Sequence, residues 1–116
     1  MDRRQRLASP TEFQRVRREG ISYAHPLVVL IACRNQLGYS RFGVTTSRSL
    51  SRAVDRNRAK RRLRHALQPH IAAGPAGFDF VLIGRPPLLD AAWQDVQSAV
   101  GSLLTKAVGR QPEEQT

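Results

Sequence analysis

The sequence predicts a single α+β domain, residues 1–116, in which helices pack on a mixed sheet of about four strands. The chain has 116 residues, 41% of them hydrophobic, which is enough for one modest core. Short β-branched runs alternate with longer segments whose apolar residues recur at helical spacing. The order is helix, three strands, helix, strand, helix (αβββαβα), with no internal repeat and no sign of a second domain.

The first helix is expected to begin at Pro10. Ser9 is a natural N-cap, Pro10 suits the first helical position, and Glu12 completes a capping box. Gly20 is expected to end this helix in the left-handed conformation. Residues 1–8 form a basic arm that we expect to be mobile without a partner.

Three extended segments are expected next. Residues 23–33 contain one or two of them, with Pro26 as a break or edge position, and the short β-branched run 27–33 is the buried part. The following strand spans 41–46. Because only a short connection containing Gly38 separates these strands, we expect them to form an antiparallel pair.

A second helix is expected from Ser51, as its N-cap, to about Leu67, before Pro69, with Asp55 in its first turn. Its apolar residues share about a third of the helical circumference. They are Ala59, Leu63, Ala66 and Leu67. The remaining arc carries Asn57, Arg58, Lys60, Arg61, Arg62, Arg64 and His65. Positive charge at this density destabilises an isolated helix, so it predicts a polyanionic partner.

The last expected strand spans 78–83. Asp90 is expected to cap a final helix that Gly109 ends. Residues 110–116 are polar, contain two glutamates and are expected to be disordered.

Composition narrows the class of partner. The net charge of +10 and the pI of about 11.5 are typical of nucleic-acid-binding proteins. No apolar run approaches the ~20 residues that span a bilayer, and the N-terminus lacks the apolar stretch of a signal peptide. A single cysteine, Cys33, excludes an internal disulfide and favours a reducing, cytoplasmic location.

The residues predict neither a catalytic site nor a metal site carried by the protein itself. The three histidines do not have the spacing of a zinc site, and no second cysteine supports one. Asp79, Asp90 and Asp95 are better explained as caps and solvated positions than as an acid–base pair. Any chemistry should therefore come from the partner.

Residues 53–64, Ala-Val-Asp-Arg-Asn-Arg-Ala-Lys-Arg-Arg-Leu-Arg, resemble the RNR signature of the bacterial ribonuclease P protein component. Three further blocks resemble that family in the same order. They are the first-helix pattern from Arg6 to Gly20, the strand from Arg41 to Arg48, and the segment Phe78 to Pro86. The resemblance extends from residue 6 to about residue 108.

The resemblance implies an endoribonuclease subunit. Ribonuclease P removes the 5′ leader of precursor tRNA, and its RNA subunit catalyses this with Mg²⁺, which the RNA binds for the most part. The protein is then a monomeric RNA-binding cofactor, one copy per catalytic RNA, without catalytic residues. The residues implied to contact ribonuclease P RNA are Arg52, Arg56, Asn57, Arg58, Lys60, Arg61, Arg62 and Arg64. Arginine forks suit phosphates. For Arg56, near the apolar arc, a role in bracing the fold is the alternative.

The resemblance also implies a cleft between the first helix and the sheet that holds the single-stranded leader. Its residues here are Phe13, Arg17, Val29, Ile31 and Arg48. Phe13 is expected to stack on a base, with an ordinary core contact as the alternative. Arg17 stands where the family often has a second aromatic, and Ile31 where tyrosine is frequent. Leader binding is therefore expected to depend more on charge.

The implied fold is an α-β sandwich like domain 2 of ribosomal protein S5. It includes a left-handed crossover from strand 41–46, through the basic helix, to strand 78–83, against the usual right-handed rule. Two other functions stay open from the residues alone. A ribosomal or other structural RNA-binding protein would share the charge. A membrane-surface binder would need a broader apolar face than this narrow stripe.

Overall fold

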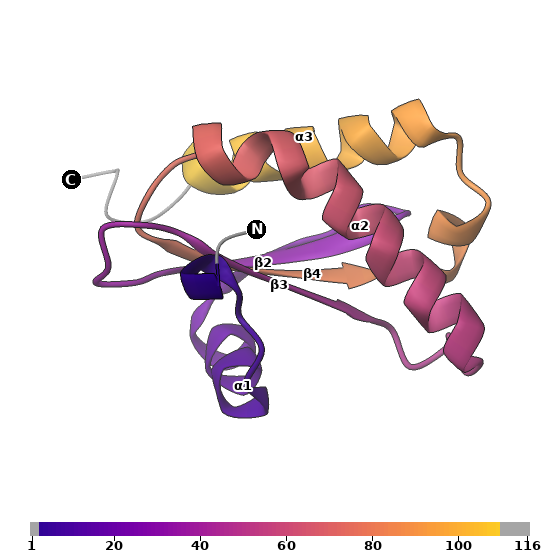
Figure 1. The fold of residues 1–116 in the computed structure, drawn as a ribbon, viewed down its shortest axis with the longest axis horizontal. Helices are drawn as coiled ribbons and strands as arrows, with labels where there is room; N and C mark the ends of the chain where they lie inside the picture. Colours follow the sequence, from indigo (N-terminus) through magenta and orange to yellow (C-terminus); the bar gives the residue numbers. More distant parts are fainter. Residues whose placement is uncertain (1–2, 110–116) are drawn as a thin grey trace.

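In the computed structural model, which describes residues 3–109, a four-stranded mixed sheet is covered by helices on both faces (Figure 1). The elements are η1 Arg3–Gln5, α1 Pro10–Glu19, β1 Ile21–Tyr23, β2 Val28–Arg34, β3 Arg41–Thr46, α2 Ala53–Ala73, β4 Phe78–Gly84, η2 Pro86–Leu89 and α3 Trp93–Gly109. The predicted αβββαβα order is confirmed, with two short 3-10 turns (η1 and η2) added.

The strands lie in the order β1-β2-β4-β3, so the predicted pairing of β2 with β3 is wrong. β4 lies between them, antiparallel to β2 and parallel to β3. In register, Val81 of β4 is opposite Ile31 on one side and Gly43 on the other. The physical reason is burial: β4 is an almost continuous apolar run, and such a run is stable only where both its faces and both its edges are covered.

Because β3 and β4 are parallel neighbours, the chain must cross over between them, and α2 is that crossover. The end of β3 is therefore joined to the start of the basic helix by the connection 47–52. The left hand of the crossover, implied by the resemblance, stays a prediction.

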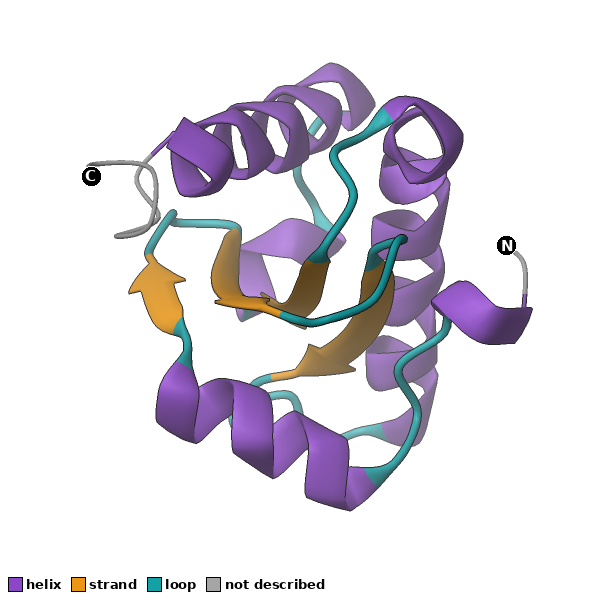
Figure 2. Cartoon of the chain, turned by 90° about the vertical axis from the view of Figure 1, so that its left-hand side faces the viewer, coloured by secondary structure: helices purple, strands orange, loops and turns teal. Residues whose placement is uncertain are grey.

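The two faces of the sheet carry separate cores. α2 and α3 cover one face and α1 covers the other, as Figure 2 shows in the view turned by 90°. Alternate β4 residues serve the two faces: Phe80 and Leu82 pack under α2 and α3, while Val81 packs under α1. The α1 core is the smaller and consists of Leu7, Val16, Ile31, Cys33 and Val81, with Phe13, Val29 and Ile83 at its margin.

Both predicted signals at the ends of α1 are corrected by the structure. Ser9 has the extended backbone of an N-cap but makes no side-chain capping bond, and Glu12 pairs instead with Arg41 at 2.6 Å. Gly20 is extended (φ −85°, ψ 172°), not left-handed. Glycine is required for space, because a Cβ there would lie 2.6 Å from the Val16 carbonyl oxygen and 2.8 Å from that of Ala32.

The other two long helices also differ from prediction at their ends. α2 has Arg52, not Ser51, at its N-cap position, and it continues through Pro69 to Ala73. Ile71 still packs on the core beyond the proline, which favours this continuation. α3 begins at Trp93, because residues 86–89 form η2 and Asp90 lies at the C-cap of that turn.

Residues 3–8, which we expected to be mobile, pack against β3 in the structure. The Leu7 N–H donates to the Phe42 carbonyl at 2.9 Å, Arg6 forms a parallel bridge with Phe42, and Leu7 is 2% exposed. The apolar Leu7 explains the difference, because it completes the α1 core. The rest of the expected arm, residues 1–2, and the expected disordered tail, 110–116, lie outside the described residues.

Candidate nucleic-acid interface

The exposed side of α2 presents cations that have no partner among the residues that the structure describes. Its buried stripe is the predicted one, Ala59, Leu63, Ala66 and Leu67. Within residues 3–109, the other side carries side chains without any hydrogen bond or ion pair, namely Asn57, Arg58, Lys60, Arg61 and Arg64. No carboxylate of the described chain neutralises these charges, so they remain available to a polyanion.

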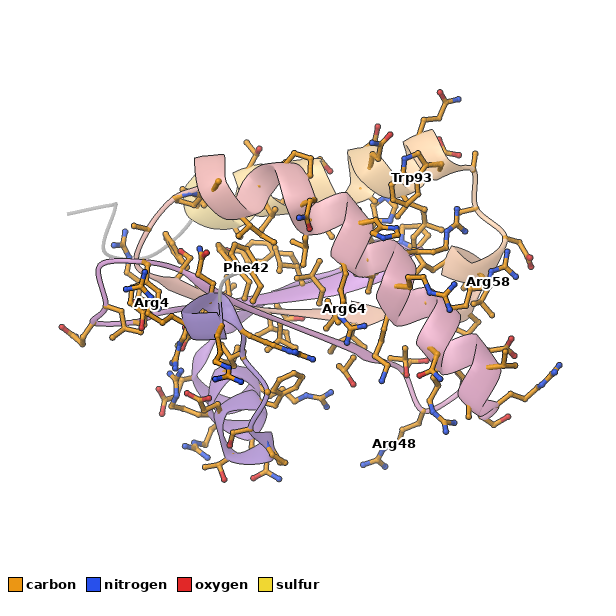
Figure 3. All side chains as sticks on the ribbon, in the orientation of Figure 1. Arg4, Phe42, Arg48, Arg58, Arg64 and Trp93 are labelled. Atoms are coloured by element: carbon orange, nitrogen blue, oxygen red, sulfur yellow. The ribbon has the colours of Figure 1, made fainter. Side chains whose placement is uncertain are left out.

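Because of the helical repeat, the basic residues of α2 lie on its solvent-facing side and on two flanks, one toward β3 and one toward α3. Lys60 and Arg64 lie on the flank toward β3, where both line a hollow of about 180 Å³ with Arg6, Phe13 and Gly43. On the opposite flank, Arg62 reaches η2 and the segment just before α3. Figure 3 shows Arg64 near the middle of α2 and Arg58 closer to its first turns. The basic surface therefore wraps over the helix.

Arg56 and Arg62 are bound into the fold. Arg56 Nη1 donates to the carbonyl oxygens of Leu50 and Ser51, at 3.3 and 2.6 Å, which is the bracing role that we considered for it. The Arg62 guanidinium donates to three carbonyls of the segment between β4 and α3. These are Leu88 at 2.7 Å, Leu89 at 3.0 Å and Ala91 at 2.8 Å. Arg62 was expected as an RNA contact, and only the structure identifies its structural role.

Arg52 lies at the first end of the same surface. It is exposed at the N-cap position of α2, with its Nε 4.0 Å from Asp55 Oδ2. Such an exposed pair contributes little to stability and leaves the arginine free to contact a phosphate.

The predicted cleft residues Phe13 and Arg17 lie together on one side of α1. Both line a hollow of about 340 Å³ with Pro10 and Gln14. Phe13 is half-buried and lies over Gly43, where a Cβ would come within 2.6 Å of its ring. Phe13 also lines the hollow that contains Lys60 and Arg64, so it connects the α1 side with the α2 surface.

The other predicted cleft residues are divided by the structure. Ile31 is only 7% exposed and packs beneath α1, so it supports the cleft from below and does not line it. Val29 is half-buried at the margin of the α1 core, opposite Ile83 of β4, which in turn is opposite Thr45 of β3. The sequence did not predict Ile83 and Thr45 as neighbours of the cleft residues, because their place beside Val29 depends on the strand order.

Arg48 is exposed in the segment between β3 and α2 (Figure 3). It is close along the chain to both Thr45 of β3 and the first turn of α2. From this position Arg48 can contact a ligand bound either at the α1 side of the sheet or on α2.

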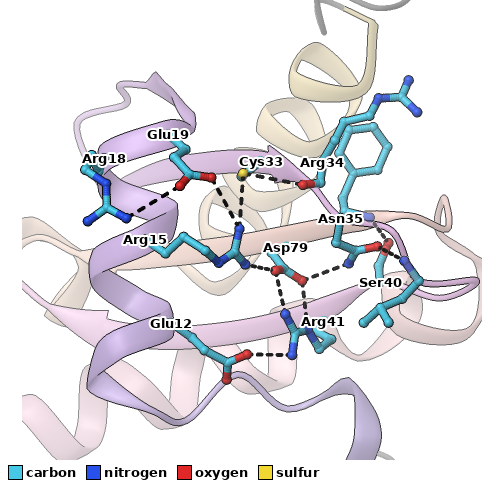
Figure 4. A network of polar contacts seen from close by, with 12 residues as sticks. Glu12, Arg15, Arg18, Glu19, Cys33, Arg34, Asn35, Ser40, Arg41 and Asp79 are labelled. Atoms are coloured by element: carbon cyan, nitrogen blue, oxygen red, sulfur yellow. Dashed lines mark hydrogen bonds and ion pairs between the residues drawn. The ribbon is translucent and has the colours of Figure 1, made fainter.

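A buried charge network fixes α1 on the sheet (Figure 4). Asp79 is 0% exposed in β4 and accepts hydrogen bonds from Arg41 at 2.9 and 2.8 Å, from Asn35 at 2.8 Å and from Arg15 of α1. We expected Asp79 at a cap or a solvated position, and this is wrong. A carboxylate inside an apolar strand must find partners, which was the signal in the sequence.

The charges of this network are mutually dependent. Burial alone would raise the pKa of Asp79, but hydrogen bonds from Arg41 and Asn35 outweigh it, so the pKa of this carboxyl lies below its ordinary value. The hydrogen bond to Asp79 raises the pKa of Arg41. Burial raises the pKa of the Cys33 thiol beside Arg15. The network is therefore fully ionised near neutral pH, with a neutral thiol next to it.

Among residues 3–109, no group of three or more His, Cys, Asp or Glu is placed to hold a metal ion. Within the same range, no helix is both long and apolar enough to cross a bilayer. The fold and the free cations on α2 define a small α+β protein that binds a polyanion through its side chains.

Comparison with known proteins specifies this class. The family described as Ribonuclease P matches residues 1–108, so the chain belongs to the ribonuclease P protein family, components of an endoribonuclease of tRNA processing. The ribonuclease P protein component of Herpetosiphon aurantiacus is 40% identical over 107 residues, covering 92% of this chain and 87% of the relative. That of Roseiflexus castenholzii is 40% identical over 111 residues, covering 92% and 88%.

Solved structures support the same family assignment. The Staphylococcus aureus RNase P protein superposes with a TM-score of 0.77 at 29% identity, covering 89% of this chain and 94% of that chain. The Thermotoga maritima RNase P protein gives a TM-score of 0.76 at 28% identity, covering 87% and 96%. The fold predicted from the resemblance, an α+β domain with a four-stranded mixed sheet, is confirmed.

Proposed function

We propose that this chain binds the catalytic RNA of ribonuclease P through α2 and the 5′ leader of precursor tRNA through the α1 side of the sheet. The observation that carries the proposal is the set of α2 side chains that have no partner within residues 3–109. A folded protein gains nothing from cations that repel one another on one helix, so their clustering points to a binding role.

The contacts to the RNA subunit are divided by accessibility. Asn57, Arg58, Lys60, Arg61 and Arg64 contact the RNA directly, with Arg52 at the end of the surface. Arg56 and Arg62 mainly hold the two ends of the surface in place through backbone carbonyls. Cations that contact phosphates displace counterions, so binding must weaken steeply as salt increases.

The leader site combines stacking with charge. The half-buried ring of Phe13 offers a face for one unpaired base, and Arg17 supplies a cation beside it. Val29 and Ile83 form the apolar floor next to α1, and Ile31 supports that floor. Arg48 is placed to meet the leader backbone where it leaves the floor.

The RNA subunit carries catalysis in this proposal. The carboxylates of Asp79 and Glu12 are engaged in ion pairs with Arg41. In this proposal Mg²⁺ is held mainly by RNA. The protein acts by lowering the repulsion between RNA subunit and precursor tRNA. It acts as a monomer, one copy per RNA, in the cytoplasm, which suits its single cysteine.

Reconstitution tests this function. Ribonuclease P RNA at low Mg²⁺ is given a leader-bearing precursor tRNA, with and without the protein, and cleavage at the mature 5′ end is measured. The protein should increase the rate strongly at low Mg²⁺ and much less at high Mg²⁺, where the ion itself screens the phosphates. Absence of stimulation with intact RNA binding would instead support the alternative, a structural RNA-binding protein without a processing role.

A further inference from the structure

Trp93, the first residue of α3 and the chain's single tryptophan, leaves part of its large aromatic ring in water. It is 39% exposed, whereas Phe42, Phe78, Phe80 and Tyr23 are buried. The remaining aromatic residues, Phe13 and Tyr39, are half-buried. Exposure of a single apolar side chain is normal in a folded protein, so a binding role for Trp93 depends on the residues around it.

Arg62 fixes both the position and one face of the indole. Its guanidinium donates to the carbonyls of Leu88, Leu89 and Ala91, so the segment that leads into Trp93 is tied to α2. The guanidinium carbon also lies 5.9 Å from the centroid of the Trp93 ring, a cation–π contact. The ring is therefore held next to the basic helix with one side against an arginine and much of its surface still exposed.

The neighbouring charges suit RNA. Arg58 is one helical turn before Arg62 on the same flank of α2, is exposed and has no partner in the described chain. Figure 3 shows Arg58 and Trp93 at the same end of the molecule. Asp95 is directed away from this flank, because it lines a hollow with His25 and Ser98 on the other side of α3. An aromatic face bordered by arginines is the usual platform for an unpaired base.

The two flanks of α2 thus each end at an aromatic residue. On the β3 flank, Lys60 and Arg64 share a hollow with Phe13. On the α3 flank, Arg58 and Arg62 are followed by Trp93. The proposed leader site accounts for Phe13 and leaves Trp93 without a function.

We infer that Trp93 is a base-stacking residue for the RNA subunit, which places an unpaired nucleobase on the indole while Arg58 contacts the adjoining phosphate. The inference rests on the proposed function and extends its RNA surface from α2 to the start of α3. A protein partner is disfavoured, because it would have to bury the unpaired Arg58 of the same flank against a carboxylate of its own. Arg62 acts here as a positioning residue.

Intrinsic fluorescence tests the inference without any substitution, because Trp93 is the sole tryptophan. The wild-type protein is titrated with ribonuclease P RNA, and separately with precursor tRNA. Emission and accessibility to acrylamide are recorded beside an independent measurement of RNA binding. Stacking should quench the emission and protect the indole at one equivalent of ribonuclease P RNA. Unchanged emission and accessibility while the RNA binds would overturn the inference and leave the proposed function intact.

Two further outcomes separate the possibilities. If ribonuclease P RNA does not bind at all, the proposed function fails and this inference fails with it. If precursor tRNA quenches Trp93 and ribonuclease P RNA does not, the assignment to the RNA subunit is wrong.

Substitution gives the energetic test. Trp93→Ala should weaken binding of ribonuclease P RNA about tenfold, which corresponds to about 1.4 kcal/mol and lies within the range of base–aromatic stacking. Trp93→Phe, which keeps a ring, should lose about threefold or less. Leu37→Ala is the matched control, because Leu37 is a similarly exposed apolar residue (38%) in the β2–β3 connection. Equal affinities of the Trp93→Ala and Leu37→Ala proteins, both folded by circular dichroism, would contradict the inference.

Discussion

Arg41 and Asp79 form a two-point ion pair inside the α1 core, with Nε and Nη2 of the guanidinium 2.9 and 2.8 Å from the two carboxylate oxygens. The third nitrogen of the same guanidinium, Nη1, pairs with Glu12 at 2.6 Å. One arginine of β3 therefore joins β4 to α1, and Arg15 adds a second connection from α1. Because Phe13 lies on the same helix, the position of the proposed leader site depends on this network.

Replacing Asp79 should destabilise the protein. Asp79→Asn removes the negative charge between Arg15 and Arg41, leaving two largely covered guanidinium groups without their counter-charge. Breaking a buried pair in this way costs about 3 kcal/mol. Urea unfolding measures the loss. Asp95→Asn, which changes an exposed carboxylate of α3, should stay within about 0.5 kcal/mol of wild type. Similar stabilities for the two variants would mean that the network contributes little.

The same pair predicts acid sensitivity. The pKa of Asp79 is lowered from its ordinary value of 3.8, so the unfolded chain takes up the proton first as the pH falls. The contribution of Asp79 is complete above the unfolded value and is lost as the pH falls through the folded one. The free energy of unfolding should therefore decrease as the pH falls below about 5, more steeply in wild type than in Asp79→Asn. Parallel pH profiles of the two proteins would refute this assignment.

Alanine substitutions at Gly20 and Gly38 test whether the glycine at position 20 is required because a Cβ has no room there. The extended backbone of Gly20 suits any residue, yet a Cβ would meet two carbonyl oxygens and Ile31 within 2.8 Å. Gly20→Ala should therefore cost about 2 kcal/mol by overpacking. At Gly38 a Cβ meets nothing within 4 Å, so Gly38→Ala should be neutral or slightly stabilising. Thermal unfolding of both variants decides, and a neutral Gly20→Ala would show that α1 can shift at no cost.

Replacing the adjacent residues Arg61 and Arg62 should have different effects: one substitution should weaken RNA binding and the other should lower stability. Arg62→Ala removes three hydrogen bonds to backbone carbonyls and should lower the free energy of unfolding by about 2 kcal/mol. Arg61→Ala should leave stability unchanged, because Arg61 is exposed and has no partner in residues 3–109. It should weaken binding of ribonuclease P RNA and reduce the salt slope by about 1. Equal loss of stability in both variants would contradict the division between the exposed Arg61 and the hydrogen-bonded Arg62.

Replacing Phe13 should weaken binding of the leader more than binding of the mature part of the tRNA. In the reconstituted holoenzyme, Phe13→Ala should weaken binding of leader-bearing precursor tRNA by roughly tenfold and leave binding of mature tRNA nearly unchanged. Arg18→Ala is the control on the same helix, because Arg18 is exposed and pairs only with its neighbour Glu19 among the described residues. Equal losses for precursor and mature tRNA would show that Phe13 acts only through packing.

Local patterns predicted most of the elements but not how the strands pair. Pro10, the β-branched run before Cys33 and the apolar spacing of α2 depend on nearby residues. The elements that they predict are present, although α2 continues past its expected end to Ala73. The neighbour of β2 is β4, not β3, because strand order depends on which run must be covered on all sides. Glu12 shows the same limit: its spacing from Ser9 suits a capping box, but Arg41, distant in sequence, binds it.

The sequence by itself determined the class of protein, the basic helix and its buried stripe, because charge and helical periodicity are local properties. Only the tertiary structure decided which of those basic residues are free. Arg61 has no partner in the described chain, while Arg62, its neighbour, is bound to the segment before Trp93. The same holds for Asp79, whose partners come from α1, β3 and the connection after β2. A side chain's role depends on what the fold brings next to it, and that information lies in other parts of the chain.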